Sequence, residues 1–181
     1  THEVAEKICA KTHIRLKKRY KNILTIIIPR HINRVPKIIN ELEELNLNVH
    51  LHSSGNKIVN NTDIYLVDAY GKTKMFFSIC NIVFLGGSLI SHGGQNPLEA
   101  ARYNCQILHG PNIWNFIEIY NLLKRLNVSQ RVLNKEQFEK KISILLDNKK
   151  NKKNIKSKLN LLSKKILKST LIELNHYTIK Q

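Results

Sequence analysis

The feature that most limits the fold of this chain is a repeated alternation of short apolar runs with amphipathic segments. The apolar runs are predicted strands at Ile23–Pro29, Val49–His52, Ile64–Val67, Ile82–Leu85, Gln106–His109 and Gln130–Leu133. The segments of helical period are Glu3–Tyr20, Val35–Leu45, Thr73–Cys80, Pro97–Tyr103, Phe116–Leu126 and Glu136–Leu146. Strands that alternate with helices through short connections form parallel sheets covered on both faces. The sequence therefore predicts an α/β fold with a doubly wound parallel sheet.

The composition is that of a globular chain. Hydrophobic residues make up 42% of the 181 residues, which is enough for one domain with its own core. No apolar run approaches the roughly 18–20 residues that a membrane-spanning helix needs. The three cysteines, Cys9, Cys80 and Cys105, are widely spaced, so we expect reduced thiols in a cytosolic protein and no zinc site.

The charge is strongly positive, with 30 basic and 13 acidic residues and a net charge of +17. Such an excess attracts polyanions, but it does not choose among nucleic acid, anionic lipid and phosphorylated substrates. The lysines are dense in a C-terminal segment, residues 149–181, which we separate from a main domain of residues 1–148. We expect a basic amphipathic helix there that packs back on the domain. A helix on an anionic membrane surface, or one that binds nucleic acid, is the alternative.

A glycine-rich segment follows the predicted strand Ile82–Leu85. It begins with Gly86-Gly87-Ser88 and continues to Gly93-Gly94-Gln95 and the start of a helix. Glycines let the backbone turn sharply and approach a ligand closely. Asn96 is a favoured N-cap, Pro97 suits the first helical position, and free N–H groups there attract anions. Glu99 could close a capping box or accept hydrogen bonds from the two hydroxyls of a ribose. The segment therefore predicts a site that binds phosphate and nucleotide.

Two further segments follow other predicted strands. Pro29-Arg30-His31 ends the first apolar run, and Asp68-Ala69-Tyr70-Gly71-Lys72 ends the third. Ligands of open α/β sheets bind beyond the carboxyl ends of the strands, so one crevice can collect all three segments. A guanidinium such as that of Arg30 suits phosphate or carboxylate. Each segment taken alone is equally compatible with an ordinary surface turn.

In this order and spacing the segments resemble the 3-deoxy-D-manno-octulosonic acid (Kdo) transferases of lipopolysaccharide synthesis. The resemblance lies in Ile28–His31 with Arg34, in Asp68–Gly71, and in the stretch GGSLISHGGQNPLEAARYNCQILHGPNIWNF. It runs from about Thr1 to about Val132. It implies the Rossmann-like C-terminal half of a GT-B glycosyltransferase, the half that binds the donor CMP-Kdo without a metal or other cofactor.

The resemblance also implies roles for particular residues. Pro29 and Arg30 would contact the nucleotide, with Arg30 at its phosphate. Residues at the cytosine would be Tyr70, Gly71 and Lys72. The phosphate and the ribose would be held by Asn96, Pro97, Leu98 and Glu99, with Glu99 at the ribose. Supporting positions are His31, Ser88 and Gly94. No catalytic residue is expected in this chain, because the family's catalytic base is a glutamate of the N-terminal domain.

The implied function is transfer of Kdo from CMP-Kdo to the lipid A precursor, lipid IVA, at the cytoplasmic face of the bacterial inner membrane. Expected partners are the donor, this acceptor, an anionic membrane surface and the enzyme's own N-terminal domain, but not nucleic acid. The chain departs from the family at Lys72, where glutamate is usual, and at Gln95, where histidine is usual. An inactive or split remnant of such an enzyme is therefore an alternative, and a basic nucleic-acid-binding module is a third.

Overall fold

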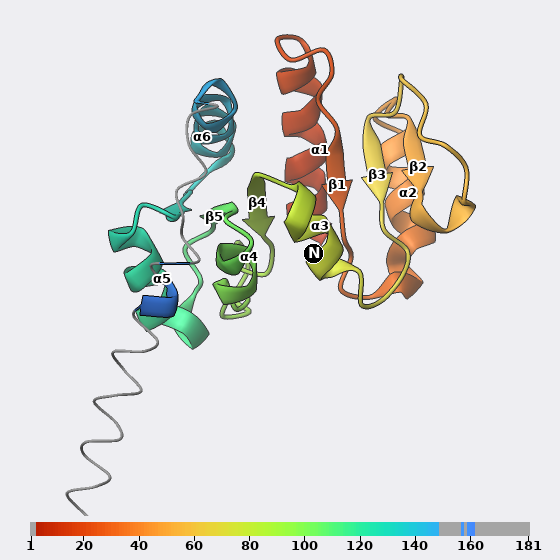
Figure 1. Cartoon of the computed structure of the whole chain (residues 1–181). Coiled ribbons are helices and arrows are strands. Elements are labelled where there is room, and N and C mark those ends of the chain that lie inside the picture. Colours follow the sequence, from red (N-terminus) through yellow and green to blue (C-terminus); the bar gives the residue numbers. More distant parts are fainter. Residues whose placement is uncertain (1–2, 149–156, 158, 162–181) are drawn as a thin grey trace, which may run out of the picture.

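The computed structural model describes residues 3–148, 157 and 159–161, and strands alternate with helices along this part of the chain (Figure 1). The strands are β1 (Thr25–Ile27), β2 (Val49–Leu51), β3 (Ile64–Leu66), β4 (Ile82–Leu85), β5 (Gln106–His109) and β6 (Ser129–Arg131). The α-helices are α1 (Glu3–Lys17), α2 (Val35–Glu43), α3 (Thr73–Ile79), α4 (Leu98–Arg102), α5 (Ile117–Arg125) and α6 (Lys135–Asp147). The α/β class predicted from the alternation is confirmed.

The strands form two parallel sheets of three. In one sheet β3 lies between β1 and β2, and in the other β5 lies between β4 and β6. All of these pairs are parallel, with Ile27 opposite Leu66 in the first sheet and Leu85 opposite His109 in the second. The sequence predicted one continuous sheet, and the structure differs because β1 and β4 do not pair.

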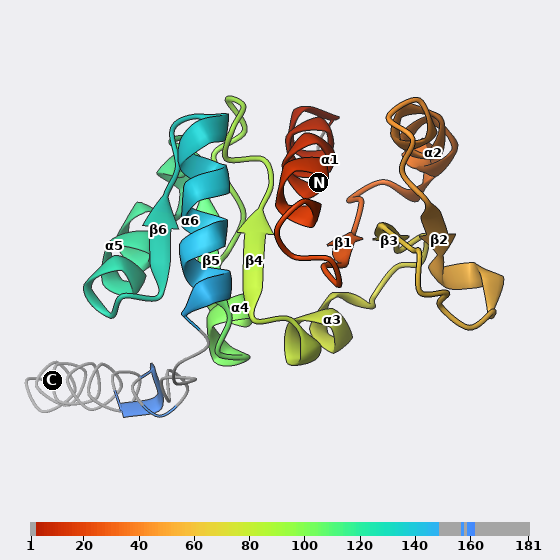
Figure 2. The same ribbon diagram turned by 90° about the horizontal axis from the view of Figure 1, so that it is seen from above.

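The helices form two layers that continue from one sheet to the other. Helix α1 packs against α2 over the first sheet and against α6 over the second. On the opposite side α3 packs against α4. Figure 2 shows α1 and α2 on one side of the first sheet and α3 on the other. The arrangement is therefore the helix–sheet–helix layering of doubly wound folds, with a break between β1 and β4.

Three helices end at an asparagine in the left-handed backbone conformation. Asn46, Asn104 and Asn127 have φ of 57°, 63° and 56° and follow α2, α4 and α5. The next residue in each case returns its N–H to a carbonyl of the last helical turn, as Val128 does to Leu123 at 2.8 Å. Asparagine tolerates this conformation better than most residues, which makes it a helix terminator. Each of these turns leads directly into the strand that follows the helix.

Each sheet has its own apolar core. The first core includes Ile38 and Leu42 from α2 with Ile64 and Leu66 from β3. The second is built from α4, β5 and α5, and its fully buried members include Ala100, Ala101, Ile107, Leu123 and Val128. Leu159 is buried in this second cluster. The remainder of the predicted C-terminal helix lies outside the described residues.

Most boundaries of the helices and strands fall within a few residues of the predicted ones. The differences at β1, β6 and α4 bear on the candidate site and the sheets. Strand β1 is shorter than the predicted Ile23–Pro29 run, because only Thr25–Ile27 pair with β3. Strand β6 begins at Ser129, earlier than the predicted Gln130–Leu133, because Ser129 pairs with Ile107. Helix α4 has five residues and begins at Leu98, not at Pro97.

Candidate functional site

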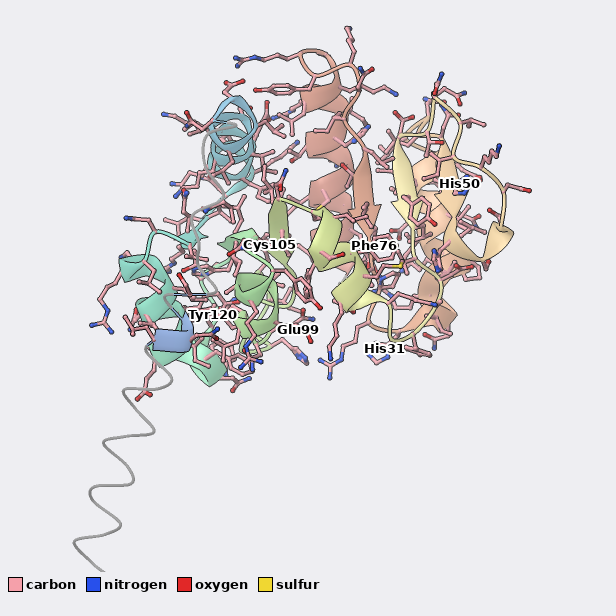
Figure 3. All side chains as sticks on the ribbon, viewed as in Figure 1. His31, His50, Phe76, Glu99, Cys105 and Tyr120 are labelled. Atoms are coloured by element: carbon pink, nitrogen blue, oxygen red, sulfur yellow. The ribbon has the colours of Figure 1, made fainter. Side chains whose placement is uncertain are left out.

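A cavity of about 1080 Å³ connects the carboxyl ends of the strands with the space between β1 and β4. Of the residues predicted to bind a nucleotide, the cavity lining contains Pro29, Arg30, Tyr70, Gly71, Gly94 and Asn96. They come from all three segments that the sequence singled out. Figure 3 shows two further predicted residues, His31 and Glu99, at the edge of the molecule where β1 and β3 end. The cavity therefore collects residues from all three segments, whereas the other predicted residues are not part of its lining: His31, Lys72, Ser88, Pro97, Leu98 and Glu99.

The turn after β4 is fixed to the end of β5 by a buried hydroxyl. Gly87 has a φ of 78°, which permits the turn, and the Ser88 side chain is completely buried. The Ser88 hydroxyl donates to the Leu85 carbonyl at 2.7 Å and accepts from the Gly110 N–H at 2.7 Å. A Cβ at Gly110 would meet the Ser88 carbonyl oxygen. Ser88 is thus placed to shape the turn, and its hydroxyl is engaged within the protein.

The second glycine pair is held against α5 and the loop before it. Gly93 and Gly94 have φ of 79° and 80°, and a Cβ at Gly93 would collide with the Asn115 side chain. The Tyr120 hydroxyl donates to the Gln95 carbonyl at 3.0 Å. Burial raises the pKa of the Tyr120 hydroxyl, so this donor keeps its proton. These contacts leave the loop little freedom, which is favourable for a binding site because less entropy is lost on binding.

The start of α4 differs from the expected free helix terminus. The Asn96 side chain accepts a hydrogen bond from the Leu98 N–H at 3.0 Å, so one of the amides expected for phosphate is already used. A helix of five residues also has only a small dipole. Glu99 lies 3.6 Å from the Lys74 ammonium and is half-exposed. Its carboxylate faces a cation at the edge of the site.

The contact that joins the two sheets at the crevice is between Arg30 and His92. The Arg30 Nη1 atom lies 3.2 Å from His92 Nε2, and both side chains line the cavity. Arg30 follows β1 and His92 lies in the glycine-rich loop after β4. Because a guanidinium has no acceptor, Arg30 is the donor in this contact. Sequence reasoning missed His92, although its place just before Gly93 was a usable signal.

The segment after β3 is positioned by Asp68. Its carboxylate accepts hydrogen bonds from the N–H and the hydroxyl of Ser53, which connects the end of β3 to the end of β2. Burial raises the pKa of Asp68, but the hydrogen bonds from Ser53 outweigh that effect and lower it. Gly71 then turns with a φ of 74°. Tyr70 is 65% exposed at the rim, and the exposed Lys72 immediately precedes α3.

A buried histidine, His109, stands at the end of β5. It stacks on Tyr120, with the ring centres 4.3 Å apart. Burial lowers its pKa, and nearby Arg131, Lys141 and Lys124 lower it further, against a hydrogen bond to the Gly110 carbonyl. His109 therefore contributes no positive charge at neutral pH. Among the lysines and arginines of the described residues, only Arg30 lines the cavity.

Within the described part of the chain, no group of three or more histidine, cysteine, aspartate or glutamate side chains is placed to hold a metal ion. A search of the same residues for a helix long and apolar enough to cross a membrane found none.

Comparison with known proteins identifies relatives of this chain, although no family model matches it. The chain is 30% identical over 157 residues to the 3-deoxy-D-manno-octulosonic acid transferase of Haemophilus influenzae, a match that covers 86% of this chain and 36% of the relative. It is 37% identical over 136 residues to a bifunctional glycosyltransferase/methyltransferase of Fusobacterium nucleatum, covering 74% of this chain and 21% of that protein. Among solved structures it matches the C-terminal CMP-Kdo binding domain of WaaA from Acinetobacter baumannii. That match has a TM-score of 0.79 and 25% identity, and it covers 87% of this chain and 82% of the domain.

The chain is homologous to the Kdo transferases. It spans about a third of the length of the curated Kdo transferases that it matches. The structural match is to the C-terminal CMP-Kdo binding domain of WaaA, which agrees with the resemblance found in the sequence.

Proposed function

We propose that this chain is the donor-binding domain of a Kdo transferase and binds CMP-Kdo in the crevice at the ends of β1, β3 and β4. The observation that carries the proposal is the contact between Arg30 and His92, which brings a cationic side chain at the end of β1 against the glycine-rich loop after β4. A nucleotide phosphate in this crevice would meet a guanidinium on one side and a rigid main-chain turn on the other.

The proposed roles divide the nucleotide among the three segments. Arg30 donates hydrogen bonds to the phosphate, and Pro29 contacts the nucleotide beside it. Tyr70 and Gly71 contact the cytosine from the rim, with Lys72 close by. Asn96, Pro97 and Leu98 support the phosphate side of the crevice. Glu99 exchanges its contact with Lys74 for the two hydroxyls of the ribose, since a carboxylate can accept both at once.

The proposed reaction is a direct displacement in a metal-independent GT-B enzyme. A hydroxyl of the acceptor, which we propose to be the lipid A precursor lipid IVA, attacks the anomeric carbon of Kdo. The bond between that carbon and the phosphate oxygen breaks, CMP leaves with the electron pair, and the hydroxyl proton passes to a base. We assign that base to a partner N-terminal domain. Arg30 stabilises the negative charge on the departing phosphate, an effect of preorganised electrostatics.

The proposed location is the cytoplasmic face of the bacterial inner membrane. The net charge of +17 supports it, because such a surface attracts anionic headgroups and phosphorylated lipids.

Titration calorimetry with CMP tests the donor site. Arg30→Ala is expected to weaken binding by about 10- to 100-fold, since a hydrogen bond to a charged group contributes about 1.5–3 kcal/mol. Arg125→Ala removes the same charge from the exposed end of α5, outside the cavity lining, and is the matched control. Equal loss of affinity in both variants would show that CMP responds only to net charge. Glu99→Ala is expected to weaken CMP binding more than Glu43→Ala, and more than it weakens binding of the 2′-deoxy analogue.

A further inference from the structure

The strand ends give a nucleotide bound in the crevice a direction across the molecule. Figure 2 shows β3, β1, β4 and β5 in this order. Tyr70 follows β3, Arg30 follows β1, His92 follows β4 and Asn115 follows β5. A ligand whose cytosine lies at Tyr70 and whose phosphate lies at Arg30 therefore continues toward His92 and Asn115. Whatever is attached to the phosphate meets these two side chains.

The proposed donor brings a second anionic group into the crevice. Kdo is a sugar acid, and the carbon atom that is bonded to the phosphate oxygen in CMP-Kdo also bears the carboxylate. The phosphate and the carboxylate are therefore close neighbours. Among the lysines and arginines of the described residues, only Arg30 lines the cavity. With its guanidinium at the phosphate, other hydrogen-bond donors have to meet the carboxylate, because a desolvated charge without partners is costly.

Two polar side chains of the cavity lining continue from Arg30 toward the second sheet. His92 contacts Arg30 through Nε2 at 3.2 Å, and an imidazole has a second ring nitrogen that can face a ligand oxygen. The Asn115 Nδ2 atom donates to the His92 carbonyl oxygen at 3.5 Å, and a carboxamide has two N–H donors. Both side chains are exposed and line the cavity. They are therefore accessible to a ligand held by Arg30.

The backbone around Gly93 holds these two side chains near each other. The His92 N–H donates to the Ile90 carbonyl at 2.7 Å, and the Asn115 N–H donates to the Gly93 carbonyl at 3.3 Å. A Cβ at Gly93 would collide with the Asn115 carboxamide and with the Trp114 indole. The carboxamide can lie against the loop only because residue 93 is glycine. Its placement before a ligand arrives reduces the entropy lost on binding.

We propose that His92 and Asn115 form a subsite for the carboxylate of a sugar acid attached to the nucleotide. The inference rests on the nucleotide site proposed above, with the phosphate at Arg30. Hydrogen bonds to both anionic groups fix the orientation of the carbon atom that joins them, which is the reacting carbon of the donor. The subsite also favours nucleotides of sugar acids over those of neutral sugars. A polar site rejects an analogue that leaves its hydrogen-bonding groups unpaired.

Titration calorimetry of the 181-residue chain with CMP-Kdo and with CMP tests the subsite, because CMP lacks the carboxylate. His92→Ala and Asn115→Ala are each expected to weaken CMP-Kdo binding by about tenfold and CMP binding by less than about threefold. Ser91→Ala is the matched control. Ser91 is an exposed residue of the same loop but does not line the cavity, so neither affinity should change. Circular dichroism shows whether each variant is folded, and His92→Leu or Asn115→Leu replaces an alanine variant that is not.

A second measurement separates this inference from the nucleotide site on which it rests. Trp114 is the only tryptophan of the chain and lies beside Asn115 against Gly93, so its fluorescence reports on the subsite. Free Kdo, which has the carboxylate but no nucleotide, is expected to change this fluorescence. His92→Ala should raise the Kdo concentration needed by about tenfold. If CMP does not bind but Kdo gives this result, the nucleotide site is wrong and the carboxylate subsite is supported.

The remaining outcomes overturn the subsite. Equal weakening of CMP and CMP-Kdo by His92→Ala would show that His92 acts only on the phosphate. Unchanged affinity for CMP-Kdo in either His92→Ala or Asn115→Ala would remove that residue from the subsite and with it the proposed pair, while the donor site at Arg30 would stand. Failure of both CMP and Kdo to bind would overturn the nucleotide site and the subsite together.

Discussion

Each half of the protein has three parallel strands, but the two halves are held together differently. The first half, residues 3–79 with β1, β2 and β3, buries ionised groups in its core. The second half, residues 82–147 with β4, β5 and β6, has an apolar core and fixes its loops with hydroxyl and main-chain hydrogen bonds. The difference matters at the crevice, where the first half contributes a charged side chain and the second half a rigid turn.

In the first half, Asp63 is the centre of the buried charge. It accepts hydrogen bonds from Lys17, from His13 Nε2 at 3.2 Å and from the Asn48 N–H at 2.9 Å. Burial raises the pKa of Asp63, but these hydrogen bonds outweigh it and lower the pKa below its ordinary value. A second pair, Arg34 with the buried Glu6, is bidentate at 2.8 and 3.2 Å. These pairs fasten α1 to the sheet and to the turn that follows Arg30.

In the second half, the residues near the crevice make few ionic contacts. Ser88 and Gly110 connect the two strand ends, and Tyr120 holds Gln95. A site that binds an anion benefits when one half supplies the cation and the other half supplies a rigid loop. The cation stays available at the end of β1, while the loop that closes on it is preorganised and loses little entropy on binding.

The strongest test of the comparison removes the buried charge. Asp63→Ala is expected to lower the free energy of unfolding by about 3–5 kcal/mol, because it leaves His13 and Lys17 without their buried partner. The matched control is Asp147→Ala. That carboxylate pairs with Arg19 but is 43% exposed, so its loss should cost less than about 1 kcal/mol. Urea denaturation measures both, and equal costs would mean that the buried cluster does not support the first half.

The corresponding test of the second half is Ser88→Ala. It leaves the buried Gly110 N–H without an acceptor and is expected to cost about 1–3 kcal/mol. Ser78→Ala removes an exposed hydroxyl that bonds the Met75 carbonyl and should change stability by less than about 0.5 kcal/mol. Gly110→Ala should also destabilise the protein, because the added Cβ meets the Ser88 carbonyl. If Ser88→Ala is as stable as Ser78→Ala, the Ser88 hydroxyl does not stabilise the turn after β4.

The two buried histidines distinguish the halves by their pH dependence. Burial lowers the pKa of both His13 and His109 below 6.5. Below about pH 6.5 the unfolded chain therefore binds more protons, and stability falls as the pH is lowered, by up to about 1.4 kcal/mol per pH unit for each group. The hydrogen bond and the charge of Asp63 oppose this shift of the His13 pKa, and the charge of Lys17 reinforces it. The hydrogen bond to the Gly110 carbonyl opposes the shift of the His109 pKa, and three cations reinforce it: Arg131, Lys141 and Lys124.

Urea denaturation at pH 7.5 and 5.5 measures how much the free energy of unfolding changes between the two pH values. We expect His109→Asn to reduce this change more than His13→Asn does. The reverse order would place the stronger pH response in the first half.

The smallest effect is expected for the ion pair between α3 and α4. Lys74 and Glu99 are 3.6 Å apart, with side chains 70% and 45% exposed, so solvent screens their attraction. A double-mutant cycle of Lys74→Ala and Glu99→Ala should give a coupling free energy below about 0.5 kcal/mol. A coupling free energy above 1 kcal/mol would mean that this ion pair helps to join the two halves. The packing of α1 on α6 and of α3 on α4 would then not be their only connection.

Local pattern was sufficient to predict the elements and the place of the crevice. Ile82–Leu85 and Gln106–His109 are strands with the predicted ends, because continuous apolar runs between turn residues leave little choice. The Asn96 side chain accepts a hydrogen bond from the Leu98 N–H, but the predicted N-cap is wrong by one residue, because α4 begins at Leu98 and its N-cap is Pro97. The predicted roles of the site residues remain predictions.

Other features depend on pairs of residues far apart in the chain, and sequence reasoning did not predict these pairs. His13 and Asp63 are separated by 50 residues, and Arg30 and His92 by 62. Neither pair belongs to a local pattern, since a histidine in a helix or a loop is ordinarily an exposed polar residue. The break between β1 and β4 was also unforeseen, because a strand's own residues do not specify which strand pairs with each edge.

The sequence by itself determined where the strands and helices lie and where the backbone could turn, because hydrophobic period, helix-ending asparagines and glycines act over a few residues. The tertiary structure alone decided which charges are buried together, that Ser88 serves the fold with its hydroxyl, and that Arg30 meets the glycine-rich loop at His92. The physical reason is that burial and electrostatic pairing depend on which distant segments pack together, and only the folded chain brings those segments into contact.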